Sequence, residues 1–254
     1  MKILSFLLLL SGFVLGEVIN LGSWNEQTFT QFLQENKNNS SQLKARNFSE
    51  RFLNTKYRGN VLESAKKAAI IKENLVINLA KLDCFTFIDY VEAMKRSNNY
   101  KQFKQNVIQI RYKNGNIDYH SRNHFFTDWI SANKFEDITT KISPKAKKVT
   151  KQLNQYEHGK LYLEDIKVVQ RQICYIDSKD LDTKILNKLQ MGDYIGIYTP
   201  KAGLDVTHTG MIIKKDNQVY FRHASSKKKN RKVLDELFTQ YIKKTPGFMV
   251  LRRN

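Results

Sequence analysis

Hydrophobic residues recur at helical spacing through the first quarter of the chain. They fall into two groups, which a polar stretch at residues 36–41 separates. Apolar positions repeated every three to four residues form one face of an amphipathic helix. We therefore expect helices through most of residues 17–60 and a third helix through Leu62–Ile71. The two groups are Phe29, Phe32 and Leu33, and Phe48, Phe52 and Leu53.

A further helix is expected to begin at Cys84. Asp83 precedes it and is a preferred N-cap residue, because its carboxylate accepts hydrogen bonds from the free backbone N–H groups of the first helical turn. Four apolar residues then follow at positions that share one helical face. These residues are Phe87, Ile88, Val91 and Met94.

After an amphipathic stretch around Phe103 and Val107, the sequence predicts a short hairpin. Residues 110–113 and 116–119 flank the pair Asn114-Gly115, which accepts the positive φ angles of a tight turn. Residues 134–190 then contain short β-like pieces and no repeat.

The last third of the chain predicts an antiparallel sheet, with a turn at Asp216-Asn217. One amphipathic helix interrupts it at residues 234–242. Helices that come first and strands that come last are typical of an α+β fold. Nothing between them has the composition of a linker, so we expect one domain over residues 17–254. The expected strands are residues 194–198, 206–213, 219–223 and 248–251.

The extreme N-terminus has a different pattern. Met1-Lys2 is followed by an almost wholly apolar run, residues 3–15, which ends before Gly16 and Glu17. A membrane-spanning helix needs about 20 apolar residues, and this run is shorter. We therefore expect a cleaved signal peptide at residues 1–16, a mature chain without a stable membrane span, and a site of action in the periplasm or the cell wall.

Charge indicates what the protein attracts. The formal net charge is +19 and the isoelectric point is near 9.8, which favours anionic partners such as the acidic polymers of a cell wall. The densest basic run, residues 227–232, contains no aromatic residue. It therefore lacks the stacking platforms of a single-strand binder, and we expect no nucleic-acid partner. The run is either a solvated loop or a device that steers substrate.

Cys84 is a candidate nucleophile. A thiolate attacks where a thiol does not, and the N-terminal end of a helix favours the thiolate. The backbone N–H at this position could also stabilise an oxyanion. The alternatives are a buried structural thiol or a disulfide with Cys174, since an exported protein meets an oxidising compartment.

The candidate base comes from the strand pattern. With a two-residue turn at 216–217, position 223 pairs with position 210, so His223 is a diagonal neighbour of His208 on the same face of the hairpin. Asp205 has the opposite parity and should point away. The expected catalytic set is therefore Cys84, His208 and His223.

These residues resemble a known family, the NlpC-type papain-like peptidases. The similarity is closest to the branch described as N-acetylmuramoyl-L-alanine amidase-like, and it covers roughly residues 50–254. Several motifs in the same order are more specific than any one of them. They are Leu82–Phe87, Leu204–Gly210 and Phe221–Ser226, with Ile110–Tyr112, Ser121–His124, Asp128–Trp129 and Met191–Asp193 between them.

The resemblance implies a papain-like core in which the cysteine helix packs on an antiparallel sheet. N-terminal helices at about 17–80 and an insert at about 98–185 would surround that core. It also implies hydrolysis of muropeptide amides without a metal or other cofactor. We expect the protein to be a monomer. Tyr57 would line the site, and Asp89 stands where the family leads us to expect a glutamate.

The resemblance leaves the bond open. It favours the amide between the lactyl group of muramic acid and L-alanine, whereas the wider superfamily often cuts between γ-D-glutamate and the diamino acid. A basic envelope-binding protein with a dead site is the non-enzymatic alternative.

Metal binding is the chemical alternative. His120, His124 and Asp128 follow one another at intervals of four, which on a helix would present three ligands on one face. The glutamate of a zincin motif is missing, so we expect no metal. We expect substrate contacts instead from Tyr57, Asp83, Arg122, His124, Asp128, Trp129 and Asp205.

Overall fold

The computed structural model describes residues 16–62 and 73–253. Except for Gly16, the expected signal peptide lies outside these residues, and so does the expected third helix except for Leu62. Within the described ranges, no helix is long and apolar enough to cross a membrane.

The N-terminal part contains a strand that the hydrophobic pattern missed. β1 (Glu17–Asn20) pairs in parallel with β3 (Leu75–Asn78), so residues 17–20 are not helical as expected. The two expected helices follow as α1 (Glu26–Glu35) and α2 (Ser41–Glu50). Side-chain oxygens of Asn25 and Ser40 cap them, and α2 ends earlier than the apolar pattern suggested.

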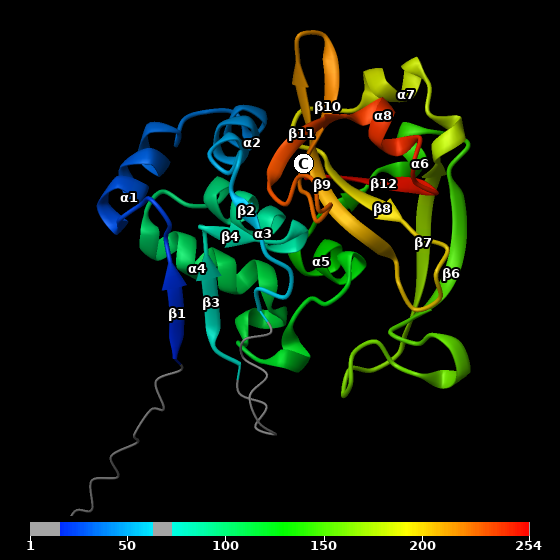
Figure 1. Ribbon diagram of the computed structural model, residues 1–254, viewed down its shortest axis with the longest axis horizontal. Coiled ribbons are helices and arrows are strands. Elements are labelled where there is room, and N and C mark those ends of the chain that lie inside the picture. Colours follow the sequence, from blue (N-terminus) through cyan, green and yellow to red (C-terminus); the bar gives the residue numbers. More distant parts are fainter. Residues whose placement is uncertain (1–15, 63–72, 254) are drawn as a thin grey trace, which may run out of the picture.

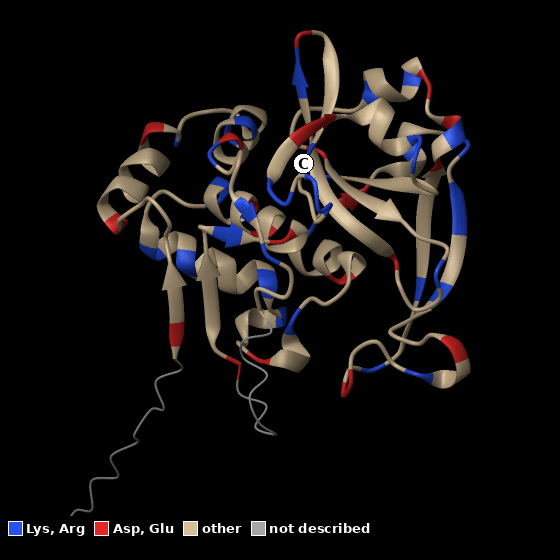
Figure 2. Ribbon diagram, viewed as in Figure 1, with Lys and Arg blue, Asp and Glu red and all other residues tan. Residues whose placement is uncertain are grey.

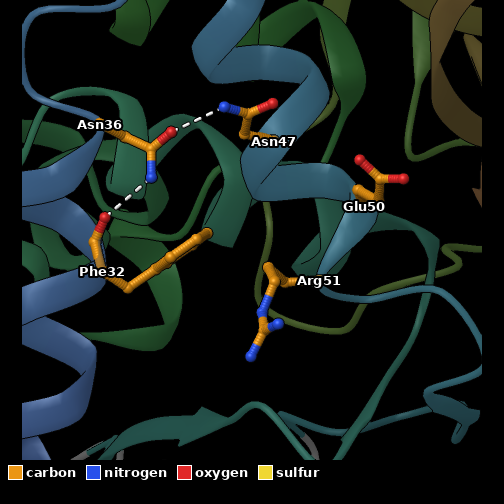
Figure 3. A pocket seen from close by; sticks show the side chains of 5 residues that line it. All are labelled: Phe32, Asn36, Asn47, Glu50 and Arg51. Carbon is orange, nitrogen blue, oxygen red and sulfur yellow. Dashed lines mark hydrogen bonds between the residues drawn. The ribbon is translucent and has the colours of Figure 1, made fainter.

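Residues of α1, α2 and their C-terminal ends line a hollow (Figure 3). Asn36 spans it: its side-chain amide donates to the Phe32 carbonyl at 2.9 Å, and its Oδ1 accepts from Asn47 at 2.7 Å. Because these contacts satisfy the buried amide of Asn36, the hollow is a feature of helix packing.

The helix expected to begin at Cys84 is present as α3 (Cys84–Lys95). The hairpin expected after residue 110 is wrong. α4 (Tyr100–Arg111) runs through its first half and buries Ile110 and Arg111, because this face continues the apolar stripe of Phe103 and Val107. The pair Asn114-Gly115 does adopt positive φ angles, +56° and +67°, but it turns the chain out of a helix.

An eight-stranded antiparallel sheet forms the other half of the molecule (Figure 1). Its order is β11-β10-β9-β8-β12-β7-β6, and β5 pairs with the end of β12. The expected strands are all present, and the turn at Asp216-Asn217 has φ angles of +52° and +56°. The strands are β5 (Glu136–Asp137), β6 (Lys147–Leu153), β7 (Val169–Asp177), β8 (Tyr194–Tyr198), β9 (Val206–Lys215), β10 (Gln218–Ala224), β11 (Val233–Leu237) and β12 (Gly247–Arg252).

Part of one expected helix is a strand. Residues 233–237 form β11 beside β10, and only Phe238–Ile242 is helical, as α8. Over so short a stretch, the apolar residues of 234–242 fit the helical repeat of 3.6 residues as well as the strand repeat of two. Pairing with the edge of β10 selects the strand for residues 233–237.

Both faces of the sheet are covered. α3 packs against β9 and β10 on one face, in a buried cluster that also includes Phe29, Phe48 and Tyr194. The opposite face carries a second cluster, in which Phe221 and Phe238 pack together. Cys84 therefore lies where the helical half meets the sheet. The remaining elements are β2 (Lys56–Tyr57), β4 (Lys81–Leu82), α5 (Phe126–Asn133), α6 (Thr139–Ile142), α7 (Thr183–Lys188) and four short 3-10 turns, η2 to η5.

Candidate active site

Cys84 is the first residue of α3, and its surroundings hold the helix start rigidly. The Asp83 carboxylate accepts from the Phe85 and Thr86 backbone N–H groups at 3.0 and 2.8 Å. The Thr86 hydroxyl in turn accepts from the Asp83 N–H at 3.0 Å, which completes a capping box. From the sheet, the Thr209 hydroxyl donates to the Cys84 carbonyl at 2.9 Å. The sulfur is thus fixed against β9, one residue from His208.

The Cys84 thiol is protonated in the resting site. Burial raises its pKa to about 11, and the charge of Asp83 acts in the same direction, whereas hydrogen bonds from Thr209 oppose both. Cys174, on β7, is also a free thiol and is half-buried. The structure therefore contains no disulfide between the two cysteines.

The predicted hairpin register is confirmed. Gln218 pairs with Lys215 and Arg222 with Met211, which sets position 223 opposite position 210. His208 Nε2 and His223 Nδ1 are 2.7 Å apart, so the two imidazoles meet as the parity argument requires. A Cβ at Gly210 would lie 2.5 Å from the Phe221 ring, and this glycine therefore permits the close packing of the two strands.

Glu236 extends the histidine pair, and it fixes the position of the protons. Its Oε1 lies 3.1 Å from His223 Nε2. An ionised carboxylate only accepts, so His223 carries its proton on Nε2 and presents Nδ1 as an acceptor. His208 must then donate from Nε2. This leaves His208 Nδ1, which has no hydrogen-bond partner among the described residues, as a basic nitrogen.

Burial keeps both imidazoles neutral. It lowers the pKa of His208 to about 3, and the neighbouring His223 and Lys227 act in the same direction. It also lowers the pKa of His223, against the opposing effect of Glu236. The hydrogen bond from His223 and the charge of Lys227, whose Nζ lies 3.3 Å away, hold the pKa of Glu236 at about 2. The relay is therefore a carboxylate followed by two neutral rings.

Tyr241 closes the site from α8. Its ring stacks on His208 with centroids 6.3 Å apart and contacts His223 edge-on at 5.0 Å. Burial raises the pKa of Tyr241, and the charges of Glu236 and Cys84 add to it. Tyr241 therefore links the histidine pair with the surroundings of the cysteine.

A β-bulge precedes His208 on β9. Ile197 pairs with His208 but Tyr198 pairs with Val206, so β9 carries one extra residue, Thr207, at this point. A bulge bends the strand and re-aims its side chains, and bulges are common next to active sites.

Among the described residues, two hollows lie near the start of α3, and Cys84 itself lines neither of them. One has a volume of about 200 Å³ and includes Asp83, Arg122 and His124 among its lining residues. The other has a volume of about 500 Å³ and includes Tyr57. Burial raises the pKa of Tyr57, and the charges of Cys84 and Asp83 contribute to the rise. Of these four predicted substrate-contact residues, Asp83 and Tyr57 lie close to the cysteine. Arg122 and His124 share the smaller hollow with Asp83.

Arg122 and His124 are both held in place within the smaller hollow. Arg122 forms an ion pair with Glu73 at 2.6 Å. The ring of His124 contacts the Tyr119 carbonyl at 2.7 Å, and burial lowers the pKa of His124 to about 4. The neutral ring of His124 and the paired guanidinium of Arg122 both line this hollow, so each places hydrogen-bonding groups at its wall.

Three other predicted substrate contacts are structural instead. Trp129 is fully buried and donates to Asp89 at 3.0 Å. Asp205 is buried and accepts from the Thr127 backbone N–H at 2.8 Å, which anchors the first turn of α5. Asp128 forms an ion pair with Arg171 at 2.8 Å. These side chains line neither hollow, because the fold uses them to attach α5.

The alternative metal ligands do not share a helix. His120 lies in the 3-10 turn η3 (Tyr119–Ser121), His124 in a loop, and Asp128 in α5. Among residues 16–62 and 73–253, no three His, Cys, Asp or Glu side chains form a group that could hold a metal ion.

Sequence reasoning missed three members of the site: Thr209, Glu236 and Tyr241. Glu236 and Tyr241 fall in residues 234–242, which the pattern predicted as one helix. Had residues 233–237 been taken as a strand beside β10, the parity argument that joined the two histidines would have placed Glu236 diagonal to His223.

Comparison with known proteins gives a consistent result. The profile of the AmiA-like family, described as N-acetylmuramoyl-L-alanine amidase-like, matches residues 47–248. No curated protein matches the chain.

Three solved structures share the fold. A Legionella pneumophila protein of the DUF1460 family is 22% identical, with a TM-score of 0.76 over 89% of this chain and 93% of its own. An N-acetylmuramoyl-L-alanine amidase of Bacteroides uniformis is 27% identical, with a TM-score of 0.69 over 84% and 98%. A Bacteroides fragilis protein that carries the name of a xylanase is 28% identical, with a TM-score of 0.66 over 82% and 99%.

Proposed function

Because the chain belongs to the N-acetylmuramoyl-L-alanine amidase-like family, we propose that it hydrolyses the amide between the lactyl group of muramic acid and L-alanine, with Cys84 as the nucleophile. The family and the amidase-named structure support a hydrolase that acts on peptidoglycan. The observation that carries the mechanism is the relay of Glu236, His223 and His208, together with the bond from Thr209, the neighbour of His208 on β9, to the Cys84 carbonyl.

The geometry suggests how the reaction proceeds. His208 Nδ1 takes the thiol proton in concert with the attack of the Cys84 sulfur on the amide carbonyl, so that no free thiolate has to accumulate. The resulting imidazolium is stabilised through His223 by the Glu236 carboxylate. The Cys84 backbone N–H would stabilise the developing oxyanion, because the next two N–H groups of α3 are bonded to the Asp83 carboxylate.

The second half of the reaction restores the enzyme. His208 gives its proton to the amine of L-alanine, which leaves, and the acyl group remains on the sulfur as a thioester. His208 then takes a proton from water, whose oxygen attacks the thioester and releases the carboxylate product and the thiol. No step requires a metal ion.

A xylanase-type mechanism fits the site less well. Hydrolysis of a glycosidic bond generally uses two carboxyl groups on either side of the bond. Around Cys84, the Asp83 carboxylate caps α3, Asp89 is bonded to Arg111 and Trp129, and Glu236 is bonded to His223. These described carboxylates are all engaged in support, which favours the cysteine mechanism.

The proposed substrate also fits the expected location. Peptidoglycan lies outside the cytoplasmic membrane, and export through the expected signal peptide at residues 1–16 would deliver the enzyme there. The family in turn suggests an extracytoplasmic role.

Digestion of purified muropeptides followed by mass spectrometry tests the proposal. The wild type should release the intact stem peptide with a free L-alanine amine, and Cys84→Ala should release none. Cys174→Ala is the matched control, since this thiol lies away on β7, and it should keep the wild-type rate.

Two outcomes would contradict the proposal. Product formation by Cys84→Ala at the wild-type rate would remove the nucleophile. Release of the diamino acid with a new amine terminus would instead assign the bond after γ-D-glutamate, and the cysteine mechanism would stand.

A further inference from the structure

Basic residues beside Tyr57 form a cross-strand row. Lys56 lies opposite Lys81 in the parallel pairing of β2 with β4, and opposite Lys232 in an isolated antiparallel bridge. We call these three residues the lysine row, and Figure 2 shows the basic colour on β4 and the chain beside it. Like charges set directly opposite each other destabilise a sheet. The arrangement therefore costs stability in the absence of an anion.

Within the part of the chain that the structure describes, most arginine side chains form ion pairs with a carboxylate, whereas the lysines of the lysine row do not. Arg122, Arg171 and Arg222, for example, form ion pairs at 2.6–2.8 Å. Among the described residues, no member of the lysine row forms an ion pair; Lys232 Nζ donates to the neutral Asn54 amide oxygen at 2.8 Å.

Lys56 and Lys232, two members of the lysine row, line the larger of the two hollows. Arg231 adds a further positive charge to this hollow, with its guanidinium 5.4 Å from the Tyr57 ring centroid. The lining contains no aspartate or glutamate, and the volume is about 500 Å³. Its lining residues are Asn54, Lys56, Tyr57, Asn230, Arg231 and Lys232. The hollow is therefore a cationic site large enough for one or two amino-acid residues.

The distance from the nucleophile is set by the chain itself. Lys81 precedes Cys84 by three residues, so their Cα atoms lie at most about 11 Å apart. Tyr57, which pairs with Leu82, lies between the lysine row and the cysteine. A peptide that leaves Cys84 across Tyr57 reaches the lysine row after two or three residues.

We propose that the lysine row binds the carboxylates of the stem peptide on the amine side of the cut amide. This inference rests on the proposed function. An extended peptide advances about 3.3–3.6 Å per residue, so acidic groups on its second and third residues lie about 7–11 Å from the cut bond. A γ-linked glutamate in the second position keeps a free α-carboxylate, which supplies the anion that the lysine row lacks.

Paired substrates test the inference. One muropeptide carries the free α-carboxylate on its second residue, and the other carries the carboxamide there. The triple variant Lys56→Gln/Lys81→Gln/Lys232→Gln should raise KM for the acid substrate about tenfold, as expected for three exposed charge contacts. It should leave kcat, and KM for the amide substrate, nearly unchanged. Lys148→Gln is the matched control, because it is also an exposed strand lysine.

Stability gives a second readout without turnover. Removal of like charges should leave Tm unchanged or raise it slightly in the triple variant. The difference between the two substrates should also shrink at high salt, because exposed charges are screened.

The possible failures are distinct. If the wild type cleaves neither substrate, the proposed function is wrong. If it cleaves both with the same KM, or if the triple variant raises KM equally for both, the amidase stands and the lysine row is not a carboxylate subsite.

Discussion

The sheet side and the helical side of Cys84 carry polar clusters of different character. On the sheet, His208, His223 and Glu236 form a relay that ends in an available nitrogen. On the helical side, Asp89 binds Arg111 at 2.9 Å and the Trp129 indole at 3.0 Å, and all three side chains are buried.

The relay is suited to proton transfer, whereas the cluster around Asp89 supports the fold. The relay has neutral rings and one basic nitrogen, so it can take up a proton and pass the charge toward a carboxylate. In the ionic cluster both Asp89 oxygens are occupied, and Arg111 also donates to the Val76 carbonyl. It therefore joins α3, α4 and α5 beneath the substrate hollow. Mutations should separate rate from stability accordingly.

The largest effect is expected at His208. His208→Ala removes the only base of the relay next to the cysteine, and kcat should fall by a factor on the order of 10⁴, as losses of such groups do. Tm should change little. His158→Ala, an exposed histidine in another loop, is the control. A kcat close to that of the wild type for His208→Ala would erase the distinction between the clusters.

Asp89→Asn should show the opposite pattern. It leaves the buried Arg111 without its counter-charge, which costs about 3–5 kcal/mol in the free energy of unfolding, measured by urea denaturation. The kcat of the folded fraction should stay near the wild-type value. The double variant Asp89→Asn/Arg111→Met should recover part of the stability, and no recovery would mean that the ion pair is not the cause.

Glu236→Gln should weaken the relay without breaking it. A glutamine oxygen can still accept from His223, but it no longer stabilises the imidazolium with a full charge, so kcat should fall about 10–100-fold, less than a wrong tautomer costs in a triad. The pH profile of kcat provides the specific readout, since a purely structural role would leave its shape unchanged.

The last effect concerns pH. His208 has a pKa of about 3 in the folded protein and near 6.5 when unfolded, so the unfolded state binds more protons as pH falls below 6.5. The free energy of unfolding should therefore decrease between pH 6.5 and 3, by at most about 1.4 kcal/mol per pH unit from this group.

The same shift predicts the activity profile. Because His208 stays neutral, kcat/KM should not fall on passing below pH 6.5. His208→Gln should flatten the stability curve in this window, and an unchanged slope would show that other groups control it.

Local rules predicted much of the site. The N-cap at Asp83, the start of α3 and the turn at Asp216-Asn217 all follow from short-range preferences, and the period of two along β9 and β10 placed His208 next to His223. The hairpin after residue 110 failed for the same reason, because an Asn-Gly turn fits the end of a helix as well as a strand turn. Trp129 and Asp205 were misplaced because burial depends on neighbours far along the chain.

What the sequence determined by itself was the identity and local geometry of the reacting groups: a thiol at a helix start and two imidazoles on one face of a hairpin. These features depend on residues close in the chain, whose spacing fixes their relative directions. Only the tertiary structure decided that β11 would pair with the edge of β10 and bring Glu236 to His223. It also decided that Lys56, Lys81 and Lys232 would lie opposite one another on neighbouring strands. Such contacts join segments that are far apart in sequence, and the competition among possible partners is settled by packing of the whole fold.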